Sequence, residues 1–247
     1  MAQGRPHIRV LRNEEALYWA AAERFVELGV QAIADHGTFH VALAGGSTPQ
    51  GMYSLLATPD FSRRLDWSRV HLYFGDERMV SPDHEQSNFR MVRISLLDRL
   101  AEQPAAVHRI ASELTPEQAA AAYAETLQQR LPDSGFDLVL LGMGPDGHVA
   151  SLFPGSDALN KRKVSTAAVY VPKLDSWRVT LTLPVLNKAH HLIVLVSGSR
   201  KADVLRHVLR DINDAMPLPV QLLRPAGTQE WLLDAAAASH LDHRQEL

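Results

Sequence analysis

The sequence predicts an α/β protein with an open, mostly parallel sheet that is covered by helices on both faces. Two observations carry this prediction. Short apolar runs of strand length alternate along the chain with segments whose apolar residues recur at helical spacing. Several of these runs, such as Phe136 to Leu141, are apolar at nearly every position. Strands of a parallel sheet have that pattern because both of their faces are buried.

The composition is that of an ordinary globular protein. The 247 residues are 46% hydrophobic and 21% charged, so the chain can form a full core without a metal or a disulfide. The formal net charge of -3 provides no general attraction to nucleic acid or to an anionic membrane, and neither is expected as a partner. A local positive site for a small anion remains possible.

The chain has no cysteine, which excludes disulfides, thiolate nucleophiles and cysteine-ligated metals. The first residues, MAQGRPHIRVLRNEEALYW, lack the apolar segment of a secretory signal, and the longest apolar runs are too short to cross a membrane. We expect a cytoplasmic protein. Because there is no internal repeat, low-complexity block or long linker, we expect residues 1–247 to form one domain.

The first half of the chain is predicted to start with a short edge strand and to alternate from there. The expected elements are a strand at Ile8–Val10, a helix at Glu14–Ala34, a buried strand at Phe39–Ala44, a helix from Thr48 to about Leu56, a strand at Val70–Phe74 and a helix at Ser87–Leu97. Thr48 precedes Pro49, and this pair predicts that Thr48 is the N-cap of its helix.

The second half continues the alternation in a Rossmann-like order and adds a few antiparallel or edge strands. The expected elements are a strand at Val107–Ile110, a helix from Thr115 to about Arg130, a buried strand at Phe136–Leu141, antiparallel or edge strands at Val164–Val171 and Val179–Leu183, a buried strand at His191–Val196 and a helix at Ser199–Arg210. The polar end from Ser239 to Leu247 is expected to fray.

Ligands of an open α/β sheet bind beyond the carboxyl ends of the strands, and four such ends carry unusual residues. The first is a loop that combines glycines and hydroxyls at a strand-to-helix junction, namely Gly45, Gly46, Ser47 and Thr48. Glycine lets the backbone approach a ligand, and a helix N-terminus offers free N–H groups, so phosphate is favoured over a simple tight turn. The loop is neither GxGxxG nor GxxxxGK[ST], which argues against dinucleotides and nucleoside triphosphates.

The second strand end carries charged residues, Asp76-Glu77-Arg78, directly after a buried strand. Arg78 is suited to bind a carboxylate or developing negative charge, although a solvated loop with a local ion pair fits equally well. A further pair is Arg178, at the start of a strand, and Lys201, in the first turn of a helix. A lysine there opposes the helix dipole unless an anion lies nearby, so phosphate contact is the interpretation weighed against a solvated lysine.

The third strand end is Gly142-Met143-Gly144-Pro145-Asp146-Gly147-His148. Histidine, with an unperturbed pKa of roughly 6.5, can accept and return a proton near neutral pH. We therefore predict that His148 is catalytic and that Asp146 orients its ring. The other eleven histidines are expected to be structural or at the surface. No metal site is predicted, because the sequence has no HExxH motif and the adjacent His190 and His191 would point to opposite faces of a strand.

At these four segments the sequence resembles the 6-phosphogluconolactonases of the glucosamine-6-phosphate isomerase/6-phosphogluconolactonase family. The resemblance rests on ALAGGSTPQGMYSLL, YFGDERMVSPDHEQSNFRMV, DLVLLGMGPDGHVASLFPGS and RVTLTLPVLNKAHHLIVLVSGSRKADVL. These stretches follow one another in the family's order and cover most of the chain from about residue 40 to 205. The GDER and GPDGHxASLFP segments are the most specific.

The resemblance implies hydrolysis of 6-phospho-D-glucono-1,5-lactone to 6-phosphogluconate in the oxidative pentose phosphate pathway, with no cofactor. The expected partner is this small phosphosugar lactone. His148 corresponds to the general base, and Arg78 to an active-site arginine with Asp76 beside it. The residues at which the family holds the phosphate correspond to Gly46, Ser47, Thr48, Arg178 and Lys201. A monomer would suffice for this activity, and a dimer stays open.

Two other functions fit part of the pattern. A glucosamine-6-phosphate deaminase would share the fold and the phosphate loop, but that family continues from the histidine to a nearby acidic residue. Here no carboxylate follows His148 before Asp157, which weakens this alternative. A non-catalytic sugar-phosphate sensor would keep Ser47, Thr48 and Lys201 but would need neither His148 nor Arg78. A serine hydrolase is disfavoured, because Ser151 does not lie in a GxSxG elbow.

Overall fold

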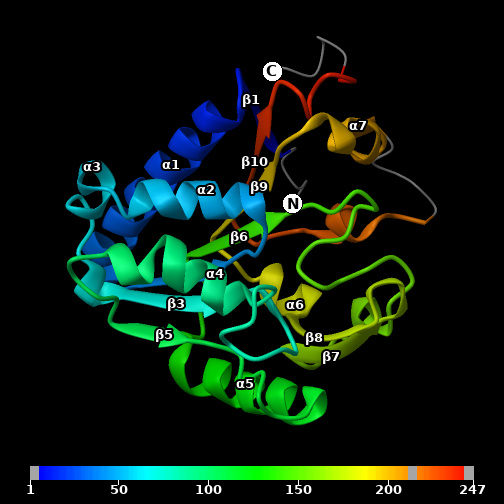
Figure 1. The fold of residues 1–247 in the computed structure, drawn as a ribbon, viewed down its shortest axis with the longest axis horizontal. Helices are drawn as coiled ribbons and strands as arrows, with labels where there is room; N and C mark the ends of the chain where they lie inside the picture. The colour runs from blue at the N-terminus through cyan, green and yellow to red at the C-terminus, as the bar shows by residue number, and fades with distance from the viewer. Residues whose placement is uncertain (1–5, 211–215, 242–247) are drawn as a thin grey trace.

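The computed structural model describes residues 6–210 and 216–241 (Figure 1). Its strands are β1 His7–Leu11, β2 Phe39–Leu43, β3 Val70–Phe74, β4 Asp76–Arg78, β5 Ala106–His108, β6 Leu138–Gly142, β7 Thr166–Val171, β8 Ser176–Leu181, β9 His191–Val196 and β10 Thr228–Asp234. Its α-helices are α1 Glu14–His36, α2 Ser47–Leu56, α3 Pro59–Ser62, α4 Asn88–Ser95, α5 Pro116–Arg130, α6 Leu183–Leu186 and α7 Ala202–Arg210. Residues 242–247 of the end that we expect to fray lie outside the described residues.

The main sheet has seven strands in the order β1-β10-β9-β6-β2-β3-β5, and every neighbouring pair is parallel. The predicted parallel α/β fold is therefore confirmed, and β1 lies at the edge as expected. β10, which the sequence did not reveal, fills the gap between β1 and β9. The first and last strands of the described chain are thus hydrogen-bonded neighbours.

The predicted antiparallel strands are also confirmed, and they form a sheet of their own. In the order β4-β8-β7, β8 pairs antiparallel with both neighbours. Gly75 links the two sheets: its N–H donates to Leu43 O of β2 at 2.9 Å, and its carbonyl accepts from Leu181 N of β8 at 2.8 Å. The small sheet is thereby fixed next to the carboxyl end of β3 (Figure 1).

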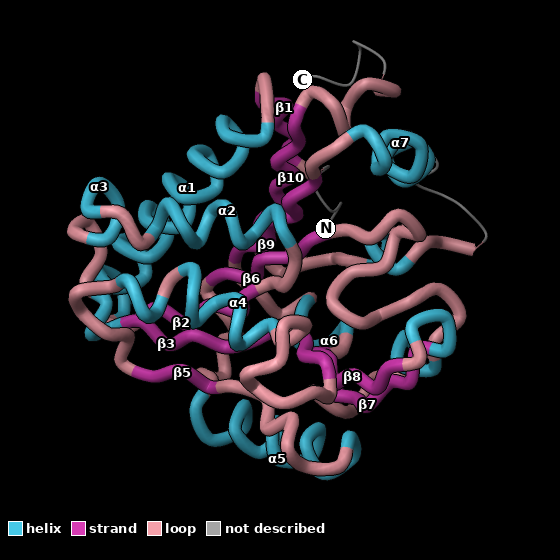
Figure 2. The backbone as a smooth tube through the Cα atoms, viewed as in Figure 1, coloured by secondary structure: helices cyan, strands magenta, loops and turns pink. Residues whose placement is uncertain are grey.

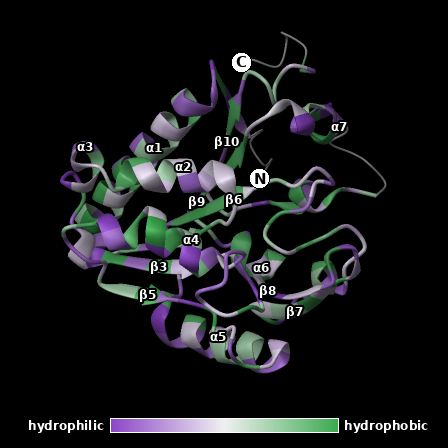
Figure 3. Ribbon diagram, in the orientation of Figure 1, coloured by the Kyte–Doolittle hydropathy of each residue, from purple (hydrophilic) through white to green (hydrophobic). Residues whose placement is uncertain are grey.

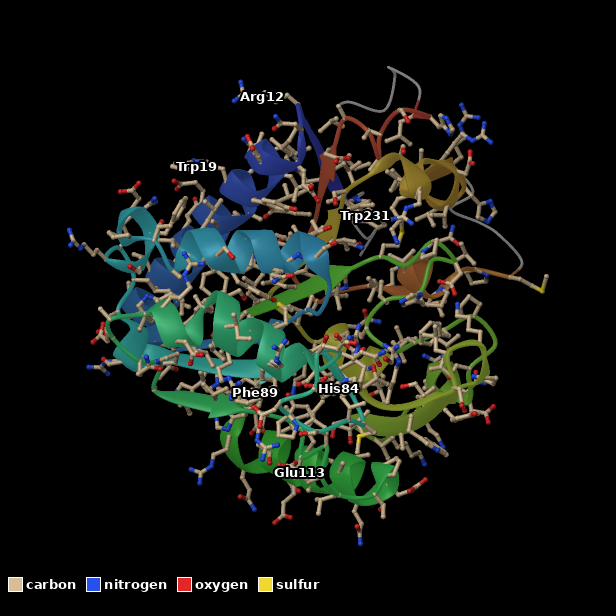
Figure 4. The ribbon with its side chains drawn as sticks, in the orientation of Figure 1. Arg12, Trp19, His84, Phe89, Glu113 and Trp231 are labelled. Atoms are coloured by element: carbon tan, nitrogen blue, oxygen red, sulfur yellow. The ribbon has the colours of Figure 1, made fainter. Side chains whose placement is uncertain are left out.

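The core lies on the apolar strands of the main sheet, which Figure 3 shows in green. Phe25, Phe39 and Trp67 pack ring against ring, with centroids 5.3 and 6.1 Å from Phe25. Trp231 of β10 is only 2% exposed, whereas Trp19 of α1 is 49% exposed (Figure 4). In the part of the chain that the structure describes, no helix combines the length and apolar character needed to cross a membrane.

One predicted helix start is wrong. Thr48 is not an N-cap, because α2 begins one residue earlier, at Ser47, and its N-cap is Gly46. Gly46 has a φ of 103°, a conformation that costs glycine little because it has no Cβ. The Thr48 hydroxyl instead lies 2.7 Å from Ser197 Oγ, at the end of β9. This contact ties the loop after β2 to the loop after β9.

Three histidines form a stack across neighbouring strands of the main sheet. The ring of His71 on β3 lies 4.5 Å from that of His40 on β2 and 5.7 Å from that of His108 on β5. Burial lowers the pKa of His40 and of His108 to about 4, and the charge of His71 acts in the same direction. His36 adds to the effect on His40, and Arg130 adds to that on His108. The three rings pack against one another in the sheet, an arrangement that fits the structural role expected for them.

This stack predicts that the protein loses stability in mild acid. In the unfolded chain these histidines bind protons at roughly pH 6.5, which is well above their folded pKa values. The stabilisation is therefore complete above pH 6.5 and is lost as the pH falls toward 4. Urea unfolding at a series of pH values measures this, and His108→Gln should flatten the slope. A wild-type stability that does not change between pH 6.5 and 4 would contradict the account.

Candidate active site

The four strand ends that the sequence singled out belong to four neighbouring strands, β9, β6, β2 and β3. Their loops open into one cavity of about 650 Å³. With the exception of Asp146, every predicted site residue lines this cavity: Gly45, Gly46, Ser47, Thr48, Asp76, Arg78, His148, Arg178 and Lys201. Figure 2 shows that the chain between β6 and β7, which carries His148, is mostly loop. The parallel sheet therefore brings together residues that lie more than 150 positions apart.

The loop after β2 approaches its neighbours so closely that glycine is required. A Cβ on Gly45 would lie 2.1 Å from Oδ1 of Asn88, the first residue of α4. Asn88 in turn donates from Nδ2 to the carbonyl and to Oδ1 of Asp76, at 2.9 and 3.1 Å. Ser47 and Thr48, at the N-terminus of α2, face the cavity. An anion in the cavity would meet the free N–H groups of this helix.

Asp76 is a buried anchor in the cavity wall. The residue is only 6% exposed, and its carboxylate accepts a hydrogen bond from Ser151 Oγ at 2.6 Å. Arg178 Nη1 lies 3.9 Å from its Oδ2. Ser151 follows Ala150, whose φ of 47° is unusual for a residue with a Cβ. No role is predicted for Asn88 or Ser151 from the sequence, because each reaches Asp76 only through the tertiary fold.

Glu77 shows that the charged segment after β3 is not a solvated loop. The segment forms β4, and the Glu77 side chain is buried among backbone donors of its own strand and of α4. It accepts hydrogen bonds from the N–H groups of Arg78, Asn88 and Phe89 at 2.7–2.8 Å. Burial raises the pKa of Glu77, while these donors act against that rise. Its role is to hold the N-terminus of α4 against the site.

Two arginines face each other across the small sheet. Arg78 of β4 and Arg178 of β8 are directly opposite in the strand register. The Nε atoms of both are buried, and neither has a hydrogen-bond partner among the described residues. Burial lowers the pKa of Arg178, and the charge of Arg78 acts in the same direction. The carboxylate of Asp76 offsets part of this charge at Arg178. An anion that binds beside both arginines would satisfy their unmet donors.

His148 is held by Asp146 two residues before it. The His148 Nδ1 lies 2.5 Å from Asp146 Oδ1. With Nδ1 donating to the carboxylate, Nε2 is the nitrogen that can accept a proton. Burial lowers the pKa of His148, and Asp146 opposes that shift. Burial would raise the pKa of Asp146, but hydrogen bonds from Lys173 and His148 outweigh it and lower that pKa to about 2.

The loop after β9 contributes a basic wall to the cavity. Arg200 and Lys201 lie in a short 3-10 turn, η5 (Ser199–Lys201), just before α7. Burial lowers the pKa of Lys201, with Asp146 opposing and Arg200 adding to the shift. β10 supports this loop, because Gly198 N donates to the carboxylate of Asp234 at 3.1 Å.

Within residues 6–210 and 216–241, no three histidine or carboxylate side chains are grouped so that they could hold a metal ion. The site instead combines a carboxylate-bound histidine, two facing arginines, a lysine and a helix N-terminus. These groups suit an enzyme that moves protons on a small anionic substrate. Fold and site together are those of an α/β enzyme, with a candidate active site at the carboxyl ends of a parallel sheet.

Comparison with known proteins identifies the family. Residues 12–232 match the model of the family described as glucosamine-6-phosphate isomerases/6-phosphogluconolactonase, and the chain belongs to this family. It is similar to the 6-phosphogluconolactonases of a Nostoc species and a Synechocystis species. Each is 36% identical to it; the alignments cover 95% and 96% of this chain, respectively, and 98% of each relative.

The solved structures agree with this assignment. The 6-phosphogluconolactonase of Trypanosoma brucei superimposes with a TM-score of 0.84 at 30% identity, over 96% of this chain and 99% of that one. The resemblance inferred from the sequence motifs is therefore confirmed. Because these relatives are lactonases by name, the chain belongs to the hydrolytic branch of its family.

Proposed function

We propose that this chain hydrolyses 6-phospho-D-glucono-1,5-lactone to 6-phosphogluconate, as a cytoplasmic step of the oxidative pentose phosphate pathway, with His148 as the general base. The observation that carries the proposal is the His148–Asp146 pair, which opens onto a cavity whose lining includes four cationic side chains, Arg78, Arg178, Arg200 and Lys201. We also propose that residues 1–247 act as one domain, because the cavity takes its lining from Glu14 through to Lys201. No cofactor is consumed in this reaction.

The chemistry needs a proton acceptor and a stabiliser for an oxyanion, because the lactone carbonyl is already electrophilic. His148 Nε2 takes the proton of a water molecule as that water attacks C1. Arg78 balances the negative charge that develops on the carbonyl oxygen. The protonated His148 then gives its proton to the departing ring oxygen. No covalent intermediate with the enzyme is formed.

The phosphate provides binding energy and orientation rather than chemistry. In the proposed complex it lies at the N-terminus of α2, where Gly45, Gly46, Ser47 and Thr48 line the cavity. Arg178 approaches from the small sheet and Lys201 from the loop after β9. The unmet donor of Arg178 and the burial of Lys201 support this placement, because both side chains gain stabilisation from a bound anion.

Two substrates distinguish this function from that of a glucosamine-6-phosphate deaminase. After His148 the chain turns inward, and Val149, Ser151 and Leu152 are all buried, with no carboxylate among them. We expect the enzyme to release acid from freshly made 6-phosphogluconolactone faster than the spontaneous reaction. We expect no ammonia from glucosamine 6-phosphate. Ammonia release without lactone hydrolysis would replace the proposed function by the deaminase.

Replacing Lys201 by methionine should weaken phosphate binding selectively. Loss of one charge-assisted contact corresponds to a rise in KM of about tenfold for the phosphorylated lactone, with kcat nearly unchanged. Steady-state kinetics with 6-phosphogluconolactone and with unphosphorylated gluconolactone test this. Lys188→Met is the matched control, since Lys188 is exposed near the amino end of β9. An equal loss with both lactones would exclude Lys201 as a phosphate ligand.

A further inference from the structure

Lys173 reaches the catalytic pair from a distant part of the chain. It lies on the 3-10 turn η4 (Pro172–Leu174), which joins β7 to β8. Its Nζ forms an ion pair with Oδ2 of Asp146. The other carboxylate oxygen, Oδ1, faces His148 Nδ1 at 2.5 Å. Asp146 is thus held from both sides, by the imidazole through one oxygen and by the ammonium through the other.

The Phe153 ring contacts both the imidazole of His148 and the ammonium of Lys173. This ring is 7% exposed, and its centroid lies 4.2 Å from the ring of His148. Lys173 Nζ lies 4.8 Å from the same centroid, within the range of a cation–π contact. The ammonium is therefore fixed by two partners, Asp146 and Phe153. The Lys173 side chain is 54% exposed, and the contact with Phe153 adds to the restraint that the ion pair alone would give.

The turn that carries Lys173 is itself braced. Tyr170 OH donates to Asp175 Oδ1 at 2.5 Å, and the rings of Tyr170 and Trp177 lie 5.3 Å apart. The next residue, Arg178, lines the cavity. The β7–β8 hairpin therefore carries two cations: Arg178, which lines the cavity, and Lys173, which pairs with Asp146.

We propose that Lys173 is a positioning residue, which holds Asp146 in the orientation that aligns and tunes His148. Through Lys173, the β7–β8 hairpin becomes part of the support of the general base. The inference rests on the proposed function in one respect, namely that His148 is the base of the reaction.

The charges around His148 determine the direction of the expected effect. Asp146, from its own loop, and Asp76, from β4, favour the protonated imidazole, while Lys173 opposes it. The charge of Lys201, from the loop after β9, interacts with that of Asp146. Removing the charge of Lys173 leaves the carboxylate of Asp146 less neutralised, so the pKa of His148 is expected to rise.

The experiment combines a titration of His148 with kinetics. The pKa of the ring is measured by NMR on the full chain without substrate, in wild type, Lys173→Met, Lys173→Arg and Lys163→Met. We expect Lys173→Met to raise the pKa of His148 and to lower kcat about tenfold with KM unchanged, because a looser carboxylate aligns the imidazole less well. Lys173→Arg should restore both values. Lys163, an exposed lysine just before β7, is the control and should match wild type.

A double-mutant cycle tests whether Lys173 acts through Asp146. In an Asp146→Asn background, Lys173→Met should cause no further loss of kcat, because the group through which it acts is already altered. A tenfold loss in that background overturns the inference, and so does a Lys173→Met variant with the pKa and kcat of wild type. If wild type hydrolyses no lactone, the proposed function is wrong and the titration alone tests the inference. An unchanged pKa of His148 in Lys173→Met then overturns the proposed action of Lys173 through Asp146.

Discussion

Replacing His148 by asparagine is expected to lower kcat for lactone hydrolysis by about 10²- to 10⁴-fold, the usual contribution of a positioned general base. Asparagine keeps a polar side chain in the loop but accepts no proton near neutral pH. The His148 side chain is 25% exposed, so the fold should survive the change. Hydrolysis coupled to 6-phosphogluconate dehydrogenase gives kcat, and calorimetry with 6-phosphogluconate shows whether the phosphosugar still binds.

The control for this variant is His190→Asn, because His190 is an exposed histidine just before β9, at the end of the sheet away from the cavity. A His148→Asn enzyme that keeps more than half of its kcat would remove His148 as the base. A wild type that binds the phosphosugar but gives no turnover would favour the sugar-phosphate sensor.

Gly144→Ala should disable the same base by displacing it, although the chemical groups of His148 and Asp146 stay unchanged. A Cβ at Gly144 would lie 2.0 Å from His148 Nδ1 and 2.8 Å from Asp146 Oδ1, so both side chains have to move. Displacement of a catalytic group by about 1 Å can cost roughly 10²-fold in rate, and we expect a loss of kcat of that order. Because side chains rather than backbone give way, the melting temperature should change little.

Gly142→Ala provides the comparison, because a Cβ there would meet only Gly45 O, at 3.9 Å. It should keep most of the wild-type kcat. If Gly144→Ala is as active as Gly142→Ala, the packing of His148 against Gly144 does not determine the alignment of the imidazole. The geometry described for the His148–Asp146 pair is then wrong.

The parts of the fold that the sequence revealed are those with a local pattern. β2, β6 and β9 are apolar almost throughout, because both faces of a central parallel strand are buried. β10 was missed, because its first three residues are polar and only Trp231 to Leu233 form an apolar run. β4 was missed because all three of its residues are charged. Their burial depends on partners in α4 and in the loop after β6, which no local pattern contains.

The site residues also fall into two groups, those that the sequence pattern predicted and those that it did not. Residues on the loops after β2, β3, β6 and β9 could be predicted, because the topology of a parallel sheet brings its carboxyl ends together. Asn88, Ser151, Phe153 and Lys173 could not, because each contacts the site through tertiary packing over 5 to 75 positions. Thr48 was given a capping role from its position before proline, whereas its hydroxyl is paired with Ser197 on another loop.

The pH dependence of kcat/KM tests the central claim most directly, namely that neutral His148 is the base. Burial lowers the pKa of His148 below the ordinary value of roughly 6.5. The base is active when unprotonated, so we predict that kcat/KM rises with pH to a plateau, with a one-proton midpoint below 6.5. The residual activity of His148→Asn should lack this acid limb. The same limb in His148→Asn, or none in wild type, would contradict the account.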